Sequence, residues 1–282
     1  MGMSSDYVQR QREFCDRAFR VLPPRILPSA MPIRAQEKSK LELVGSGTLF
    51  RVADVHLLVT AFHVLVPVDG SPHDRIWLTT SPDGGTPFPL ENVRVHTEQG
   101  GSKGLDVAVI ELTPATVEKL HGFEFLSVQE TIRDQTLPNG GRLYTFGFPI
   151  AHCEQDDGRI VFNAVGHEGE EFTGAVPSGM EFNPRIHILV DYSPTLVWGE
   201  RIPGYGMPMA LNGLSGSSLW YSRESELPQD GQGEGLKVAG FLAGVREKRW
   251  GYIVKATRWW AVDQLLRNRY PHLRSALDLR IA

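Results

Sequence analysis

From residue 41 to residue 255, short runs of apolar residues alternate with clusters of turn-forming residues. The runs are rich in β-branched and aromatic residues, which is typical of strands, and Gly, Pro, Ser and Asp cluster in turns such as 81–85 and 99–102. Many short strands in regular succession indicate an all-β body, either a barrel or a sandwich. The expected strands are 41–44, 47–52, 55–60, 74–80, 93–96, 107–112, 142–146, 159–165, 171–175, 186–192, 217–221, 237–243 and 250–255.

The two ends of the chain show a helical pattern instead. Residues 4–22 carry apolar side chains at near-helical spacing, and the prolines that begin at Pro23 are expected to end this helix. The helix is expected to dock on the main body, with a regulatory arm as the alternative, and 29–40 is expected to be a charged connector. Residues 257–269 predict a C-terminal helix, in which the pair Trp259–Trp260 packs in the core or, alternatively, forms a ligand platform.

Composition narrows the functional classes. The chain has 282 residues, 41% of them apolar and 22% charged, with a net charge of −4 and a pI near 6.1. This balance argues against a nucleic-acid partner and against an anionic membrane surface. Cys15 and Cys153 are too few for a disulfide framework, and no zinc-binding spacing is present. We therefore expect a cytoplasmic protein without a signal peptide, a membrane span, a metal or a cofactor.

Three stretches carry the groups that acyl transfer requires. His63 follows an apolar strand, Asp106 immediately precedes another, and Ser215 lies in a glycine-rich turn with Gly213 and Gly216. Each residue alone also fits an ordinary structural role: a buried core histidine, a strand-start aspartate and a plain glycine turn. Together they supply a nucleophile, a base and a group that orients the base, with backbone amides beside the nucleophile.

The chain order of these residues is informative. His63 comes first, Asp106 second and Ser215 last. An α/β-hydrolase places its serine first and its histidine last, so that fold is excluded. The spacing lets the histidine and the aspartate share one barrel while the serine comes from the next.

At these positions the sequence resembles the trypsin/chymotrypsin-like serine peptidases, the double β-barrel family, of an intracellular and disulfide-free type. The resemblance covers about residues 42–270 and follows the motifs of that family in order. The matching stretches are the Gly-Ser-Gly strand at 45–47, the Thr-Ala-Phe-His stretch at 60–63, the strand 106–112, the serine turn 213–219, the pocket strand 238–244 and the last strand from 251.

The resemblance implies a fold and a domain order. We expect an all-β protein of two six-stranded antiparallel β-barrels of chymotrypsin-like type, with an N-terminal and a C-terminal helix. The expected units are 1–40 (helix and connector), 41–150 (first barrel, with His63 and Asp106), 151–256 (second barrel, with Ser215) and 257–282 (helical segment).

The resemblance also implies roles. Ser215 is expected to attack the scissile carbonyl, His63 to take and return its proton, and Asp106 to hold the imidazole. The backbone N–H groups of Gly213 and Ser215 are expected to form the oxyanion hole. Leu214 stands where secreted members have the aspartate that pairs with a new N-terminus, so the turn must be ordered by packing, by a partner or by substrate. Ser218 replaces a proline of the family motif, which loosens the turn.

Specificity is expected to depend on the second barrel. The resemblance places Met209 at the base of the primary pocket, without a carboxylate for Arg or Lys. An apolar or small residue before the scissile bond is therefore expected, unless an acid such as Glu247 enters the pocket. The expected wall residues are Ala243, Gly244, Val245 and Gly251.

The sequence therefore predicts a serine endopeptidase that cleaves a protein or peptide substrate through an acyl-enzyme. Control by a protein partner or by the substrate is expected, because an unregulated protease is hazardous in the cytoplasm. Two alternatives stay open: a non-catalytic peptide-binding module on the same fold, and an esterase or acyltransferase that uses the same three residues.

Overall fold

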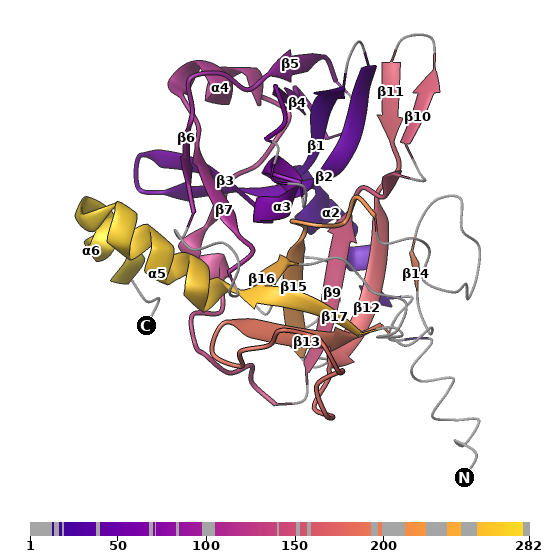
Figure 1. Ribbon diagram of the computed structural model, residues 1–282, viewed down its shortest axis with the longest axis vertical. Coiled ribbons are helices and arrows are strands. Elements are labelled where there is room, and N and C mark those ends of the chain that lie inside the picture. Colours follow the sequence, from indigo (N-terminus) through magenta and orange to yellow (C-terminus); the bar gives the residue numbers. More distant parts are fainter. Residues whose placement is uncertain are drawn as a thin grey trace.

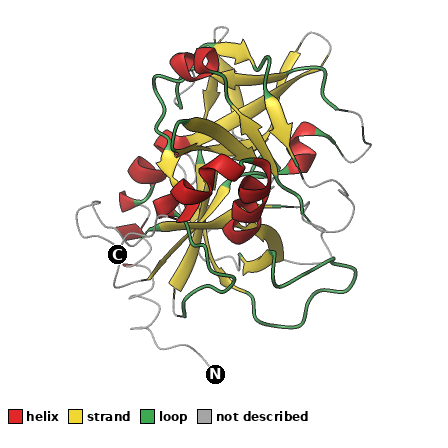
Figure 2. Ribbon diagram, turned by 90° about the vertical axis from the view of Figure 1, so that its left-hand side faces the viewer, coloured by secondary structure: helices red, strands yellow, loops and turns green. Residues whose placement is uncertain are grey.

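In the computed structural model the described residues form two large β-sheets and a two-stranded hairpin, with short helices between and beside them (Figure 1). Strands make up most of the regular structure (Figure 2). Within the described residues, no helix is long and apolar enough to cross a membrane. The described residues are 13, 17–18, 20–37, 40–67, 70, 72–82, 85–97, 105–139, 141–150, 153–156, 159–192, 197–198, 212–223, 236–243 and 253–278.

The first sheet has eight strands and curls without closing. Its hydrogen-bonded order is β5-β4-β1-β2-β3-β7-β6, and β8 pairs in parallel with β2. Among the described strands, β5 and β6 at its two edges do not pair with each other, so the predicted first closed barrel is instead a curled open sheet. The strands are β1 (Ala30–Glu37), β2 (Lys40–Val52), β3 (Val55–Thr60), β4 (Ile76–Thr79), β5 (Pro87–Pro89), β6 (Arg94–His96), β7 (Ala108–Glu111) and β8 (Leu126–Ser127).

The second sheet closes into a six-stranded antiparallel barrel, as predicted for this half. The order β13-β17-β16-β15-β9-β12 is closed by pairing of β12 with β13, and β14 adds to β12 outside the ring. Strands β10 (Cys153–Asp156) and β11 (Arg159–Phe162) form a separate hairpin. The other strands are β9 (Gly141–Gly147), β12 (Val165–Glu171), β13 (His187–Asp191), β14 (Val197–Trp198), β15 (Ser218–Arg223), β16 (Lys237–Leu242) and β17 (Ile253–Arg258).

One expectation for the N-terminal part was wrong. The described helical residues 20–21 end at a bend at Leu22, as predicted, and Pro23 begins a new short helix, α2 (Pro23–Ile26), where its missing N–H is no loss. The expected connector 29–40 is largely β1, which pairs with β2 from Ala30 to Glu37. The charged residues of this segment favoured a connector over a strand in the sequence pattern, although one of them, Arg34, is buried in the structure. Most of the expected helix at 4–22 lies outside the described residues.

The expected sheet boundary at residue 150 was also wrong, since β9 pairs with β12 and β15 of the second barrel. Short apolar strands do not reveal their partners, because pairing is decided by distant residues. Residues 172–175, expected to form a strand, are irregular, and strand β12 precedes them. The remaining helices are α3 (Phe62–Leu65), α4 (Pro114–Lys119), α5 (Trp259–Arg269) and α6 (Arg274–Asp278); α5 confirms the predicted C-terminal helix.

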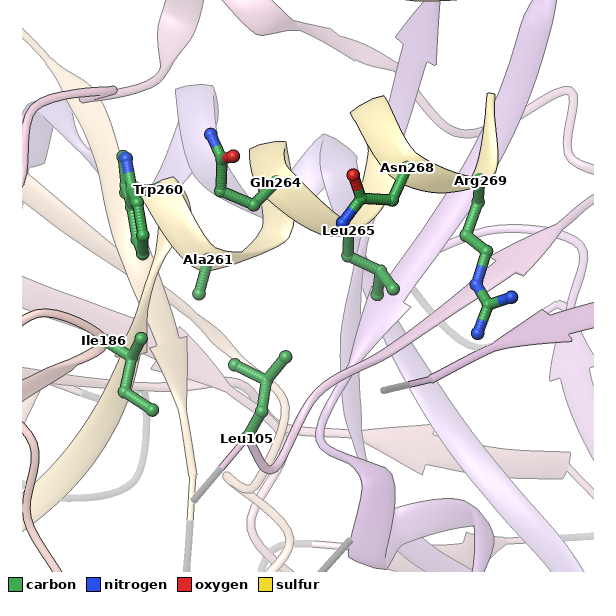
Figure 3. Close-up of a pocket in the computed structure, with 8 residues that line it drawn as sticks. All are labelled: Leu105, Ile186, Trp260, Ala261, Gln264, Leu265, Asn268 and Arg269. Atoms are coloured by element: carbon green, nitrogen blue, oxygen red, sulfur yellow. The ribbon is translucent and has the colours of Figure 1, made fainter. Parts of the chain in front are cut away.

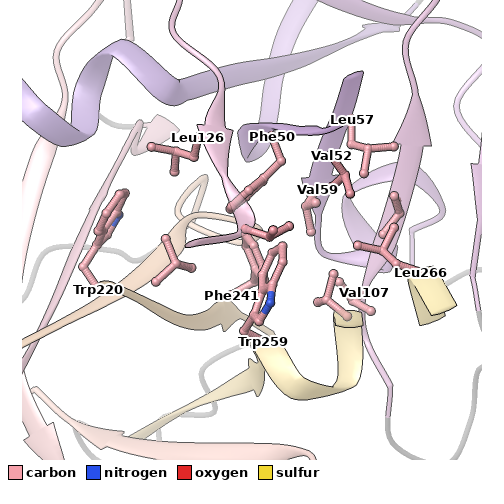
Figure 4. Packing of buried hydrophobic residues seen from close by; sticks show 14 of the residues in the cluster. Phe50, Val52, Leu57, Val59, Val107, Leu126, Trp220, Phe241, Trp259 and Leu266 are labelled. Atoms are coloured by element: carbon pink, nitrogen blue, oxygen red, sulfur yellow. The ribbon is translucent and has the colours of Figure 1, made fainter. Parts of the chain in front are cut away.

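The largest apolar cluster lies where the two sheets and α5 meet (Figure 4). Phe50 of β2, Phe241 of β16 and Trp259 of α5 pack together, with the rings of Phe50 and Trp259 4.6 Å apart. Trp259 is fully buried, which confirms its predicted role in the core. Burial of this apolar surface stabilises the packing of the two sheets against each other, which fixes their relative position.

Candidate active site

His63 and Asp106 lie at the ends of neighbouring strands. Strand β3 ends at Thr60, and His63 follows within the first turn of α3. Asp106 lies two residues before β7, which pairs with β3 through Thr60 and Ala108. The register of one strand pair therefore brings together two residues that are distant in the sequence.

Asp106 holds His63 at two points. One carboxylate oxygen, Oδ2, lies 2.6 Å from the imidazole Nδ1, and the other, Oδ1, accepts the backbone N–H of His63 at 3.0 Å. Because an ionised carboxylate only accepts hydrogen bonds, this contact favours the tautomer with the proton on Nδ1. Both side chains are about one-fifth exposed, at 22% and 21%. The second ring nitrogen, Nε2, is then the basic one.

Ser215 is the accessible residue of an otherwise buried turn. Residues 213–214 and 216–220 are buried, whereas Ser215 is partly exposed. Ser217 and Ser218, the neighbouring hydroxyls, are each 1% exposed. Gly213 and Gly216 have φ values of +96° and +84°, a left-handed region that favours glycine. The two glycines thus shape a turn that presents one hydroxyl.

This turn packs against the segment that carries His63. The backbone N–H of Ser46 donates to the carbonyl of Ser215 at 2.8 Å. A Cβ atom added to Gly216 would overlap the carbonyl oxygen of Ser46 and the hydroxyl of Thr60, and would lie 2.9 Å from the backbone nitrogen of Ala61. The glycine therefore permits a close approach between the Ser215 turn and the start of α3.

The direction of the backbone N–H groups of Gly213 and Ser215 follows from the carbonyls of the residues before them. The carbonyl of Asn212 accepts the N–H of Ile150 at 2.9 Å, and the carbonyl of Leu214 accepts the N–H of Ser217 at 2.9 Å. In a trans peptide the N–H points opposite to the C=O, so these contacts turn the N–H groups of Gly213 and Ser215 away from them. Neither N–H donates a hydrogen bond to any of the residues that the structure describes.

Leu214 takes part in ordering this turn by packing. Its side chain is 1% exposed and belongs to the core of the second barrel, together with Leu219 and Leu242. The N–H of Gly216 donates to the carbonyl of Leu242 at 2.9 Å. Of the three ways in which the sequence left the turn to be ordered, packing within the chain is the one that the described residues display.

The expected pocket residues Met209, Gly244, Val245 and Gly251 lie outside the described residues. Ala243 is buried after β16, and its N–H donates to the carbonyl of Lys255 at 2.9 Å.

A separate cavity of about 320 Å³ lies along α5 (Figure 3). Leu105, the neighbour of Asp106, borders it, and Trp260 forms one of its walls, unlike the buried Trp259. Ala243, the expected pocket residue that the structure describes, does not line it. Its lining residues are Leu105, Ile186, Trp260, Ala261, Gln264, Leu265, Asn268 and Arg269.

Sequence reasoning missed two buried hydroxyls near this site, of which that of Ser46 joins the first sheet to the Ser215 turn. Ser46 and Thr60 are fully buried, and the Thr60 hydroxyl donates to the carbonyl of Ser46 at 2.7 Å. In the sequence both residues stand within strand motifs, which predict no role for either hydroxyl. The available signal was a hydroxyl residue inside an apolar strand, because a buried hydroxyl needs a hydrogen-bond partner.

Comparisons with known proteins address the fold. No family model matches the sequence, and no curated protein matches it. An inactivated protease paralogue from the scabies mite is similar in structure, with 12% identity and a TM-score of 0.51 over 87% of this chain and 95% of that chain.

Two further structures have lower TM-scores. The serine endoprotease from Yersinia pestis has 13% identity and a TM-score of 0.49 over 89% of this chain and 67% of its own. A chain from a structure on the Sesbania mosaic virus VPg protein has 15% identity and a TM-score of 0.42 over 83% and 87%. At these identities the likeness concerns the fold alone, and the match to the scabies mite paralogue supports a chymotrypsin-like fold for this chain.

Proposed function

We propose that this chain is a serine endopeptidase in which Ser215, His63 and Asp106 form the catalytic triad. The observation that carries the proposal is the two-point contact of Asp106 with His63, at 2.6 and 3.0 Å. It fixes the imidazole in the tautomer that a general base requires, at the end of the segment against which the Ser215 turn packs.

The reaction follows from these groups. The Ser215 hydroxyl adds to the scissile carbonyl while its proton passes to Nε2 of His63. The N–H groups of Gly213 and Ser215 donate to the developing oxyanion. The C–N bond then breaks, the leaving amine takes the proton from His63, and an acyl-enzyme remains. A water molecule repeats the sequence with His63 as its base, which releases the acid and restores the serine.

The proposal includes a protein or peptide substrate, no cofactor, and a cytoplasmic location. We also propose that the enzyme prefers an apolar or small residue before the scissile bond, and that Met209 and Ala243 belong to the pocket that binds it. Control by a protein partner also remains a proposal. Leu214 and backbone hydrogen bonds hold the Ser215 turn within the chain, which supports ordering of the turn by packing.

A peptide-binding module without catalysis is the second candidate. The scabies mite neighbour, described as an inactivated protease paralogue, favours it, because that chain is similar to this one over most of its length. A fold of this kind therefore does not by itself establish catalysis. The feature that favours the peptidase is the accessible Ser215, in a turn that packs against the segment leading to His63.

Labelling with a fluorophosphonate probe distinguishes the peptidase from the non-catalytic binding module. We expect the wild type to be labelled, Ser215→Ala not to be labelled, and His63→Ala to be labelled at least about 10³-fold more slowly, because the base is lost. Ser178→Ala, which removes an exposed serine away from the turn, is the control and should label as the wild type does.

The other outcomes identify the alternatives. A folded wild type that is not labelled, alone or with cell lysate, contradicts the peptidase and supports the binding module. Labelling with ester turnover but no cleavage of a peptide library supports the esterase. Labelling that persists in Ser215→Ala excludes Ser215 as the nucleophile.

A further inference from the structure

Ser46 of β2 contacts the Ser215 turn through both its side chain and its backbone. Its hydroxyl donates to the carbonyl of Gly213 at 2.7 Å and accepts the backbone N–H of Phe148 at 3.1 Å. Its backbone N–H donates to the carbonyl of Ser215 at 2.8 Å. Ser46 is fully buried, so these hydrogen bonds do not compete with water.

With these contacts, each backbone carbonyl from residue 212 to residue 215 has a hydrogen-bond donor. The carbonyls of residues 212–215 all accept hydrogen bonds: those of Asn212 and Leu214 from Ile150 and Ser217, and the other two from Ser46. The peptide between Gly213 and Leu214 lies between the two N–H groups assigned to the oxyanion hole. Its carbonyl is held by the Ser46 hydroxyl, a side chain 167 residues away in the sequence.

A glycine peptide at this point needs such a contact. Gly213 has a φ of +96°, and glycine has access to more backbone conformations than any other residue. Rotation of the Gly213–Leu214 peptide changes φ of Leu214 and ψ of Gly213, so the two flanking N–H groups lose their common direction. A hydrogen bond to the Gly213 carbonyl opposes that rotation.

We propose that Ser46 is a positioning residue for the oxyanion hole, and that its hydroxyl keeps the N–H groups of Gly213 and Ser215 directed at the substrate carbonyl. This inference rests on the proposed peptidase function. Ser46 also accepts the Thr60 hydroxyl through its carbonyl at 2.7 Å. One strand residue thus ties the nucleophile turn of the second barrel to the His63 segment of the first sheet.

The test compares two variants that each remove one buried hydroxyl from β2. Ser46→Ala removes the hydroxyl bonded to Gly213, whereas Thr48→Val removes a hydroxyl without a hydrogen-bond partner among the described residues. Because loss of one oxyanion donor lowers a rate by about 10²–10³, misorientation should lower fluorophosphonate labelling by about 10–100-fold in Ser46→Ala. Thr48→Val should label at the wild-type rate.

Hydrogen exchange gives a readout that does not depend on activity. Mass spectrometry should show faster amide exchange at residues 212–217 in Ser46→Ala, by about tenfold or more, and wild-type exchange in Thr48→Val. If both variants match the wild type in labelling and in exchange, Ser46 is not a positioning residue. If the wild type is not labelled but Ser46→Ala still speeds exchange, the peptidase proposal fails while the contact stands.

A second variant covers a failure of Ser46→Ala to fold, monitored by thermal unfolding. Ser46→Cys keeps a side chain of similar shape but donates only weakly, so it should show the same losses in labelling and in exchange protection. Ser46→Thr keeps the hydroxyl and should restore labelling toward the wild-type rate. Wild-type labelling and exchange in a folded Ser46→Cys would overturn the proposal.

Discussion

The two sheets contribute to the candidate site in different ways. The first sheet supplies side chains that contact each other directly, since Asp106 holds His63 within one strand pair. The second barrel supplies a turn of irregular backbone with two left-handed glycines, Gly213 and Gly216. That turn is held partly by Ser46 of the other sheet. One half of the site is thus fixed within its own sheet, whereas the other half depends on how the two sheets pack.

The largest effect should come from breaking the side-chain half. Asp106→Asn replaces an acceptor-only carboxylate with an amide that can donate to Nδ1, which favours the wrong imidazole tautomer. We expect labelling and peptide cleavage to fall by about 10³–10⁴-fold with little change in thermal stability. The control is Asp134→Asn on the surface. A loss below tenfold would show that Asp106 does not orient a catalytic base.

Breaking the backbone half should act on stability instead. In Gly216→Ala the new Cβ overlaps Ser46 and Thr60 and the residue must keep a φ of +84°. We expect the free energy of unfolding to fall by about 3 kcal/mol or more, from overpacking together with left-handed strain. Urea unfolding followed by circular dichroism measures this change.

Gly70→Ala is the matched control, because it measures the cost of left-handed backbone strain alone. Gly70 has a φ of +79°, and a Cβ there meets nothing within 4 Å. It carries the strain without the overlap, so it should lose about 1–2 kcal/mol. Equal losses in the two variants would show that the turn does not pack tightly against the first sheet.

The smallest effect concerns the outer part of the first sheet. Burial lowers the pKa of His96, while Glu111, 3.9 Å from its Nε2, acts in the opposite direction and Arg269 and Arg94 add to the lowering. Burial likewise lowers the pKa of His56. A histidine with a lowered folded-state pKa is protonated first in the unfolded chain, so stability falls as pH drops below about 6.5.

Thermal unfolding at pH 7.5 and at pH 5.5 checks this expectation. The wild type should be less stable at the lower pH, and His96→Asn should lose less stability between the two values. The double variant His56→Asn/His96→Asn should show a still smaller difference in stability between pH 7.5 and pH 5.5. If His96→Asn shows the wild-type difference, the protonation of His96 is not linked to folding. Among the described residues, the ring and ion-pair contacts of His96 and His56 do not include the Ser215 turn, so labelling at pH 7.5 should be unchanged.

The three candidate residues could be named from the sequence, and their catalytic role stays a proposal. His63, Asp106 and Ser215 were identified from local context and chain order, and the structure places the first two in contact. The pocket residues rested on resemblance alone and stay a prediction. Ser46 was missed because its role depends on a partner at Gly213, and nothing near Ser46 in the sequence indicates that partner.

Local sequence patterns were sufficient to predict strand β3 at Val55–Thr60, helix α5, and a turn with glycine on both sides of Ser215. These follow from side-chain preferences and backbone freedom within a few residues. Three features depend on contacts between distant parts of the chain: β1 pairs within the first sheet, β9 belongs to the second barrel, and the Ser46 hydroxyl holds the turn. Strand register and packing between sheets are set by interactions between residues that are far apart in the chain. A pattern within a few residues therefore cannot predict them.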